Sequence, residues 1–128
     1  LGICLGMQML TSGSSEGRLP GLGLIDAYCE RIEAGEQGLR VPHMGWNQVS
    51  IEQDHPITRE VPRPAKFYFA HSFRVTCRFN DNVLARTNYG GEFASMIIRE
   101  NVVGAQFHPE KSHMFGMRLF EGFARWRP

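Results

Sequence analysis

Three residues of this chain have the types and the order that catalysis by a thiol nucleophile needs. Cys4 lies between two glycines in "LGICLG", and His108 and Glu110 follow late in the chain, separated by one proline. A cysteine attacks as its thiolate, a histidine can take the thiol proton, and a carboxylate can orient the imidazole. The first hypothesis is therefore a Cys-His-Glu triad.

The residues around Cys4 favour a sharp turn between a strand and a helix. Gly2 and Gly6 leave room for the turn and for close approach of the two elements, and "LGMQML" is helix-forming. Backbone N–H groups and the dipole at a helix start favour a thiolate. Taken alone, these residues leave open a structural reading, in which Cys4 is a small buried thiol in a tight turn.

The spacing of His108 and Glu110 predicts that their side chains meet. Pro109 disfavours helical backbone for the residue before it, so His108 is expected to be extended. In extended chain, positions i and i+2 point to the same side, so Glu110 can accept a hydrogen bond from one imidazole nitrogen. A lone triplet of this kind is most often a surface turn. Together with the glycine-flanked cysteine, it indicates a catalytic site.

Composition excludes several function classes. The 128 residues include 14 Lys and Arg and 13 Asp and Glu, and this balance gives no reason to expect a nucleic acid or an anionic membrane as partner. The sequence has no apolar run of the ~18 residues that a membrane span needs. Its three cysteines fit neither a disulfide framework nor paired zinc ligands. We expect one cytoplasmic domain that uses no metal and no cofactor.

The elements that must position these residues follow from periodicity and turn signals. A helix is expected from Leu5 to about Leu10 and another from about His113 to Trp126, with Ser112 as its cap. Strands are expected at 22–32, in the second half of 40–51, at 66–75, within 82–93, and twice within 94–108, around a turn at 99–101. Residues 11–21 and 55–65 are predicted to be loops.

Two of these elements carry clear apolar faces. The strand at 66–75 alternates, with Phe67, Phe69 and His71 on one face and Tyr68 on the other. The C-terminal helix has an apolar stripe that we expect to pack in the core, formed by Phe115, Leu119, Phe123 and Trp126. Cys29 and Cys77 lie on no glycine turn and near no base in the sequence, so we expect them to be structural.

In the segments "GICLGMQ" and "GAQFHPE", the chain resembles the class I glutamine amidotransferase family. Within that family, "PGLGLI", "PHMGWNQV", "YFAHSF" and "FHPEKS" look like the glutaminase subunits of imidazole glycerol phosphate synthase, and the resemblance covers the whole chain. It implies an α/β fold: the three-layer, flavodoxin-like amidotransferase domain with a mixed sheet. Only three residues precede Cys4, so we expect residues 1–128 to be the C-terminal portion of that domain, without its first strands and an early loop that completes the oxyanion hole.

The resemblance also implies residue roles. Cys4 would attack the glutamine amide, with His108 as base and then acid and Glu110 holding His108. The glutamine site would comprise the backbone N–H of Leu5, as an oxyanion donor, with Gln8, Glu16, Ser72 and Phe73. The last two stand where the family usually has Thr and Tyr. The partner-facing residues would be His43, Met44, Trp46, Asn47, Tyr68, His71 and Lys111.

The implied function is hydrolysis of L-glutamine through a cysteine thioester. The ammonia would pass to a cyclase subunit with a (βα) barrel fold, which forms a heterodimer with this chain and makes imidazole glycerol phosphate in histidine biosynthesis. Two alternatives stay open: a paralogous subunit that feeds ammonia to a surface-sugar synthase, and a catalytically silent fragment that acts only in assembly. From the residues alone, Trp46 could also be core packing, and His71 a partly buried polar group.

Overall fold

The computed structural model describes residues 1–35 and 38–128 and combines a mixed sheet with two α-helices. The helices are α1 (Leu5–Met9) and α2 (His113–Arg125), and the 3-10 turns are η1 (Asn80–Asn82) and η2 (Pro109–Lys111). The strands are β1 (Gly2–Ile3), β2 (Gly13–Ser14), β3 (Ala27–Arg31), β4 (His43–Ile51), β5 (Ala65–His71), β6 (Phe73–Cys77), β7 (Val83–Asn88), β8 (Glu92–Arg99) and β9 (Val102–Ala105).

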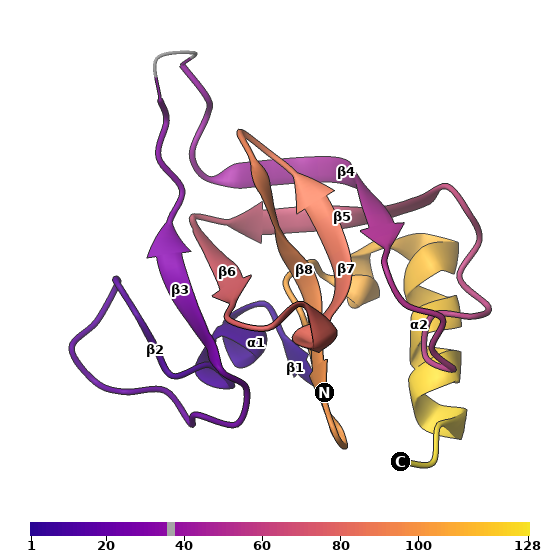
Figure 1. Ribbon diagram of the computed structural model, residues 1–128. Coiled ribbons are helices and arrows are strands. Elements are labelled where there is room, and N and C mark those ends of the chain that lie inside the picture. The colour runs from indigo at the N-terminus through magenta and orange to yellow at the C-terminus, as the bar shows by residue number, and fades with distance from the viewer. Residues whose placement is uncertain (36–37) are drawn as a thin grey trace.

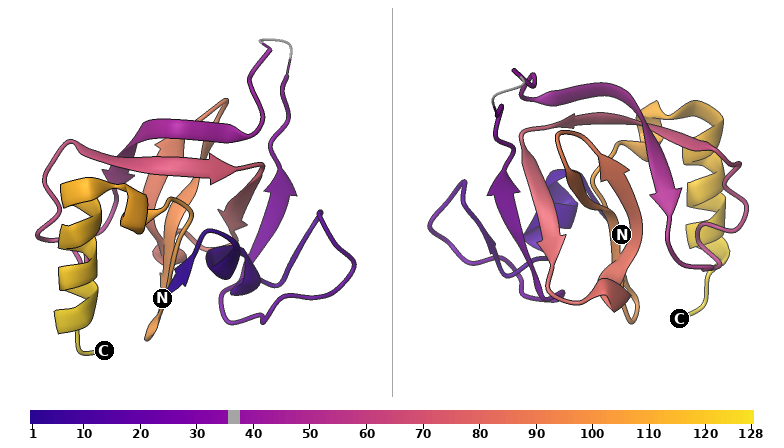
Figure 2. Two further views of the ribbon diagram at one scale, coloured as in Figure 1. Left: turned by 180° about the vertical axis from the view of Figure 1, so that it is seen from behind. Right: turned by 45° about the horizontal axis from the view of Figure 1, so that its top comes forward.

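The strands form one connected network in the order β2-β3-β6-β8-β7-β4-β5, and β9 joins β8 to β1. The β1–β9 and β2–β3 pairs are parallel and the other pairs are antiparallel, so the expected mixed sheet is confirmed. The β4–β5 ribbon crosses one end of the remaining strands, with α2 beside it (Figure 1). Both chain ends lie on the side away from this ribbon (Figure 2).

Strand β8 is buried on both faces, which explains its nearly continuous apolar sequence. Met96 and Ile98 belong to a core shared with β5, β9 and α2, whereas Ala94 and Ile97 belong to a second core with Met7 of α1. The strands that position the site are therefore held from two sides.

The single strand predicted at 66–75 is two strands. β5 ends at His71 and pairs with β4, whereas β6 begins at Phe73 and pairs with β3 and β8, so the chain changes partners at Ser72. The predicted alternation is confirmed in β5, where Phe67 and Phe69 are buried. Because alternation continues through Ser72, the sequence pattern does not reveal the change of partner.

Other boundaries also differ from the predictions. The strand predicted at 22–32 is regular only in β3, because the N–H groups of Leu22 to Ile25 donate to carbonyls at the end of α1 and just after it. The loop at 11–21 contains the short β2, and β4 begins already at His43. The two strands and turn within 94–108 are confirmed as β8 and β9.

Helix α2 has the predicted extent and core stripe, and Ser112 holds its N-cap position, but the Ser112 side chain makes no capping hydrogen bond. Leu119 is buried, and Phe115, Phe123 and Trp126 pack against the larger core. The Ser112 hydroxyl instead serves the neighbouring site, as described below. In the described parts of the chain, we find no helix whose length and apolar character would let it cross a membrane.

Candidate active site

The pairing of β1 with β9 brings Cys4 and the His108 segment to one edge of the sheet. The two strands are parallel, with Ile3 opposite Ala105, and the Cys4 N–H donates to the Ala105 carbonyl at 2.8 Å. Parallel neighbours end at the same edge, so the residues that follow them lie together. Cys4 follows β1 directly, and His108 lies three residues after the end of β9.

Cys4 occupies a backbone conformation that side chains rarely adopt. Its φ is 51° and its ψ is −108°, at the junction of β1 and α1, which supports the predicted sharp turn. A Cβ at Gly2 would lie 2.6 Å from the Gly6 carbonyl oxygen, so the strand and helix meet at Gly2. A Cβ at Gly6 would meet no described atom within 4 Å, so the expectation that Gly6 is also needed for space is wrong.

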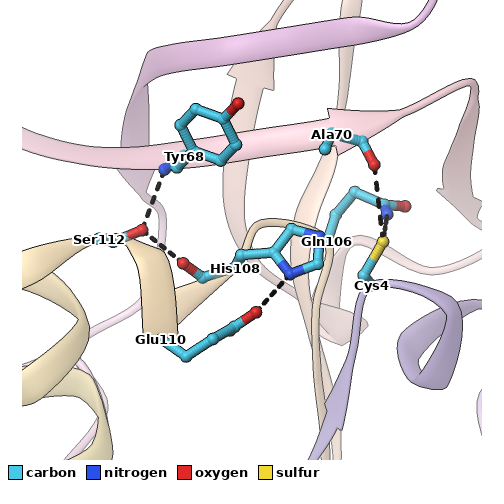
Figure 3. A network of polar contacts seen from close by, with 7 residues as sticks. All are labelled: Cys4, Tyr68, Ala70, Gln106, His108, Glu110 and Ser112. Carbon is cyan, nitrogen blue, oxygen red and sulfur yellow. Dashed lines mark hydrogen bonds and ion pairs between the residues drawn. The ribbon is translucent and has the colours of Figure 1, made fainter.

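The predicted contact of His108 and Glu110 is present, but Glu110 lies in the 3-10 turn η2, so the expectation that extended chain brings the two side chains together is wrong. His108 is extended, at φ −103° and ψ 95°, and its Nδ1 lies 2.6 Å from Glu110 Oε1. The pair lies beside β5, because the His108 N–H donates to the Tyr68 carbonyl at 2.8 Å. The buried Ser112 hydroxyl donates to the His108 carbonyl at 2.6 Å and accepts from the Tyr68 N–H at 3.0 Å (Figure 3). The Ser112 side chain thus holds the His108 segment against β5 and makes no hydrogen bond to the start of the helix.

The imidazole of His108 stands between Glu110 and the side of the site where Cys4 lies (Figure 3). With Nδ1 engaged by the carboxylate, the other ring nitrogen is free to handle a proton. Within the described residues, no direct hydrogen bond joins His108 to Cys4. Catalytic contacts are often loose before substrate binds, so this geometry is compatible with a nucleophile and its base.

Burial raises the pKa of the Cys4 thiol above its ordinary value. The Leu5 backbone N–H and the Gln106 side chain oppose this effect, whereas the nearby Glu110 carboxylate adds to it. The thiol donates to the Ala70 carbonyl at 3.8 Å. The Leu5 N–H at the helix start thus favours the thiolate, as expected, but burial has the larger effect on the pKa of Cys4.

A cleft of about 410 Å³ opens beside Cys4. All five residues predicted to hold glutamine line it: Leu5, Gln8, Glu16, Ser72 and Phe73. Sequence reasoning missed Arg31, a further lining residue whose guanidinium lies 5.9 Å from the centre of the Phe73 ring. Glu16 and Arg31 give the cleft one group of each charge, which suits a ligand with both an amino group and a carboxylate. The described side chains contain no cluster of three potential metal ligands.

Gln106 is a second residue that sequence reasoning missed. Its side chain is fully buried, and its Nε2 lies 3.8 Å from the Cys4 sulfur. Gln8 donates to its Oε1 at 3.2 Å and approaches the Phe73 carbonyl at 3.5 Å. The only sequence signal was a polar residue within an otherwise apolar strand end, between Ala105 and Phe107.

The residues predicted to face a partner separate into surface and buried groups. Met44 and Trp46 are exposed, Trp46 stacks on His113 with 5.6 Å between ring centres, and Lys111 lies 6.0 Å from the centre of the half-buried Tyr68 ring. By contrast, His43 and His71 are 3% and 5% exposed, so their predicted place on the partner-facing surface is wrong. They lie beneath it because β4 and β5 turn them toward Phe69 and Phe93. The half-buried Asn47 bonds to His43.

The sequence matches a known family model and is similar to known proteins. The family model described as "Glutamine amidotransferase class-I" matches residues 1–125. The chain is 49% identical over 123 residues to imidazole glycerol phosphate synthase subunit HisH 2 of Pseudomonas aeruginosa, covering 96% of this chain and 60% of that protein. A protein of the same name from Methanococcus maripaludis is 45% identical over 125 residues, covering 98% of this chain and 61% of that protein. The chain thus spans about 60% of the length of these relatives.

Solved structures show the same fold at low identity. A protein from Thermoplasma acidophilum, described as part of a putative GMP synthase, superposes with a TM-score of 0.67 at 19% identity, covering 94% of this chain and 53% of that one. A glutamine amidotransferase from Thermotoga maritima gives 0.62 at 22% identity, covering 95% of this chain and 45% of that one. The expected flavodoxin-like α/β amidotransferase fold is confirmed.

Proposed function

The chain belongs to the class I glutamine amidotransferase family, and from that premise we propose that it hydrolyses L-glutamine to glutamate and ammonia. The observation that carries the proposal is the position of Cys4. It lies on a strained turn beside a cleft, at the sheet edge where the His108–Glu110 pair also lies. A nucleophile, a base and an orienting carboxylate are thereby available to one substrate.

The reaction starts with proton transfer from the Cys4 thiol to His108. The thiolate attacks the side-chain carbonyl carbon of glutamine, and the Leu5 N–H, which already faces the sulfur, stabilises the developing oxyanion. His108 then protonates the leaving nitrogen, so ammonia departs and a glutamyl thioester remains. Water, deprotonated by His108, releases glutamate and restores the thiol.

The cleft holds the amino-acid end of the substrate in this proposal. Glu16 receives the α-ammonium group, while Ser72 and Phe73 line the wall where the chain changes from β5 to β6. Because the two strands have different partners, Ser72 sits at a bend between them, in the wall of the cleft.

We further propose that the ammonia goes to a cyclase subunit with a (βα) barrel fold, forming imidazole glycerol phosphate in histidine biosynthesis. The names of the relatives from Pseudomonas aeruginosa and Methanococcus maripaludis support this assignment. The exposed Met44 and Trp46, with Lys111 beside Tyr68, offer a surface of apolar and cationic groups next to the site. Asn47 follows Trp46 on β4 and donates to the Asn88 carbonyl at 3.0 Å.

Glutamate release, measured with and without such a cyclase, tests the hydrolysis. We expect activity that depends on the partner and that Cys4→Ala abolishes without loss of fold. Glutamate release that survives in Cys4→Ala would contradict the mechanism. If neither condition yields glutamate while the chain still binds the cyclase, the role in assembly alone is correct.

Growth of a histidine-requiring strain tests where the ammonia goes. We expect the gene to restore growth, and Cys4→Ala to fail. Glutamine hydrolysis without rescue would instead favour the paralogous subunit that serves another synthase.

A further inference from the structure

The buried amide of Gln106 contacts the sulfur of Cys4 from the inside of the fold. Gln106 follows β9, its side chain is 0% exposed, and its Nε2 lies 3.8 Å from Cys4 Sγ. A buried side-chain amide needs partners for its polar atoms, and here one of them is the sulfur. Gln106 belongs neither to the triad nor to the residues that line the cleft.

The neighbouring Gln8 fixes which end of this amide faces the sulfur. The Phe73 carbonyl can only accept, so the Gln8 group that approaches it at 3.5 Å is the amide nitrogen. That same nitrogen lies 3.2 Å from the other end of the Gln106 amide, which must therefore be the oxygen. It follows that Gln106 presents N–H to the sulfur.

The sulfur needs this donor most after it loses its proton. In the thiol state the S–H group donates to the Ala70 carbonyl. In the thiolate state that carbonyl faces a negative charge and offers no hydrogen, whereas the Gln106 N–H gains strength because its acceptor is ionised. A donor promotes attack only by stabilising the thiolate more than it stabilises the thiol.

We propose that Gln106, oriented by Gln8, is a catalytic hydrogen-bond donor that stabilises the Cys4 thiolate. The inference rests on the proposed function in treating Cys4 as the nucleophile, and it gives Gln8 a second task besides lining the cleft. In agreement, the Gln106 side chain lowers the pKa of Cys4 against the effect of burial.

The rate of alkylation of Cys4 by iodoacetamide, followed across pH by mass spectrometry of the Cys4 peptide, tests the donor without glutamine. Burial also raises the pKa of Cys29 and of Cys77, to about 11, and mass spectrometry distinguishes their reaction from that of Cys4 by peptide. For Gln106→Leu, which keeps the bulk and removes the N–H, we expect the midpoint for Cys4 to rise by about one pH unit. Gln8→Leu leaves the Gln106 side-chain amide free to flip, so we expect a smaller rise of the Cys4 midpoint.

Ser95→Ala is the matched control. Ser95 is also buried and accepts the Gln106 backbone N–H through its own backbone, but its hydroxyl has no partner among the described atoms. In Ser95→Ala, the pH midpoint of Cys4 alkylation should equal that of the unaltered protein. If Gln106→Leu folds but keeps the original midpoint, the inference is wrong. If it does not fold, an unchanged midpoint in Gln8→Leu overturns the inference instead. If Gln106→Leu shifts the midpoint for Cys4 but the unaltered protein releases no glutamate, Gln106 is the donor and the proposed function is wrong.

Discussion

The Nδ1 atom of His43 lies 2.9 Å from the Nε2 atom of His71, inside the β4–β5 ribbon. The Phe73 carbonyl, 2.6 Å from His71 Nδ1, can only accept, so that nitrogen carries the proton and His71 Nε2 accepts from His43. His43 Nε2 in turn accepts from the Asn47 amide at 3.2 Å. Both rings are thus neutral, and a row of hydrogen bonds leads from Asn47 to the wall of the cleft.

Acid should weaken the fold through these two rings. Burial lowers the pKa of His43 and of His71 to about 4, and the positive charge of a protonated neighbour adds to the effect at His43. In the unfolded chain both titrate near 6.5. Between pH 6.5 and 4 the unfolded state binds more protons, so stability is full above this window and falls by on the order of a few kcal/mol as the pH drops through it. Urea unfolding at several pH values measures the loss.

His71→Asn provides the comparison for this acid effect. Its amide can still donate to the Phe73 carbonyl but takes up no proton, so its stability should decline less steeply between pH 6.5 and 4. An identical decline in both proteins would show that other groups cause the acid loss.

Glu110→Gln should reduce kcat and leave KM nearly unchanged. The substitution removes the negative charge that orients His108 and stabilises the imidazolium, and loss of such a carboxylate costs up to ~10⁴-fold where it is buried. Because the Glu110 side chain is 46% exposed, we expect a loss of about 10²- to 10³-fold. Glu110 does not line the cleft, so binding should persist. Steady-state glutaminase kinetics give both constants, and Glu121→Gln, on the surface of α2, is the control.

Gly2→Ala should disrupt the turn that carries Cys4, whereas Gly6→Ala should be tolerated. A Cβ at position 2 would lie 2.6 Å from the Gly6 carbonyl oxygen, a backbone atom that cannot move aside without shifting α1. At position 6 the Cβ meets no described atom within 4 Å, and alanine favours the helix by about 0.5–1 kcal/mol. Thermal unfolding and Cys4 alkylation, measured on both variants, should separate them. Equal behaviour would contradict this account of the turn.

Ser112→Ala should lower both stability and activity. It removes the buried hydroxyl that joins the His108 carbonyl to the Tyr68 N–H and leaves that N–H without its partner. An unsatisfied buried donor costs about 1–3 kcal/mol, and the loosened His108 should reduce kcat more than it changes KM. Denaturant unfolding together with kinetics checks this, and the exposed Ser50→Ala serves as control. A loss of stability without any change in kcat would mean that Ser112 does not position the base.

Glu16→Gln should raise KM for glutamine by about two- to fivefold with little change in kcat. Its carboxylate lines the cleft, and a charge-assisted bond to the substrate ammonium is worth this much at an exposed site. The exposed Glu30 on β3 is absent from the cleft lining, so Glu30→Gln should keep the original KM. A change of kcat alone at position 16 would place Glu16 outside the binding site.

Several local features were predictable from the sequence because they depend on neighbours along the chain. Pro109 disfavours helical backbone at His108, and the 3-10 turn that begins at Pro109 brings Glu110 back to the imidazole, so the 2.6 Å contact forms within three consecutive residues. The turn at Cys4 and the core stripe of α2 were equally readable, from flanking glycines and from helical spacing. The amidotransferase family was recognisable from such short segments.

Other features required the fold, because they depend on which distant segments pack together. Ser112 has the sequence of a helix cap, yet its hydroxyl bonds to Tyr68 and His108 instead of to the N–H groups of α2. The alternation of the strand at 66–75 put His71 on the face of Phe67 and Phe69, but only the register of β4 and β5 shows that His43 lies opposite it and that both rings are buried.

The sequence alone therefore singled out Cys4, His108 and Glu110 as the proposed nucleophile, base and orienting carboxylate, since residue type and near neighbours along the chain point to each of them. The tertiary structure decided how these groups are tuned. Burial of Cys4 outweighs the helix start and raises the pKa of its thiol, and only packing brings the Gln106 amide to the sulfur. Desolvation and long-range contacts arise from the whole fold, so no local pattern could have revealed them.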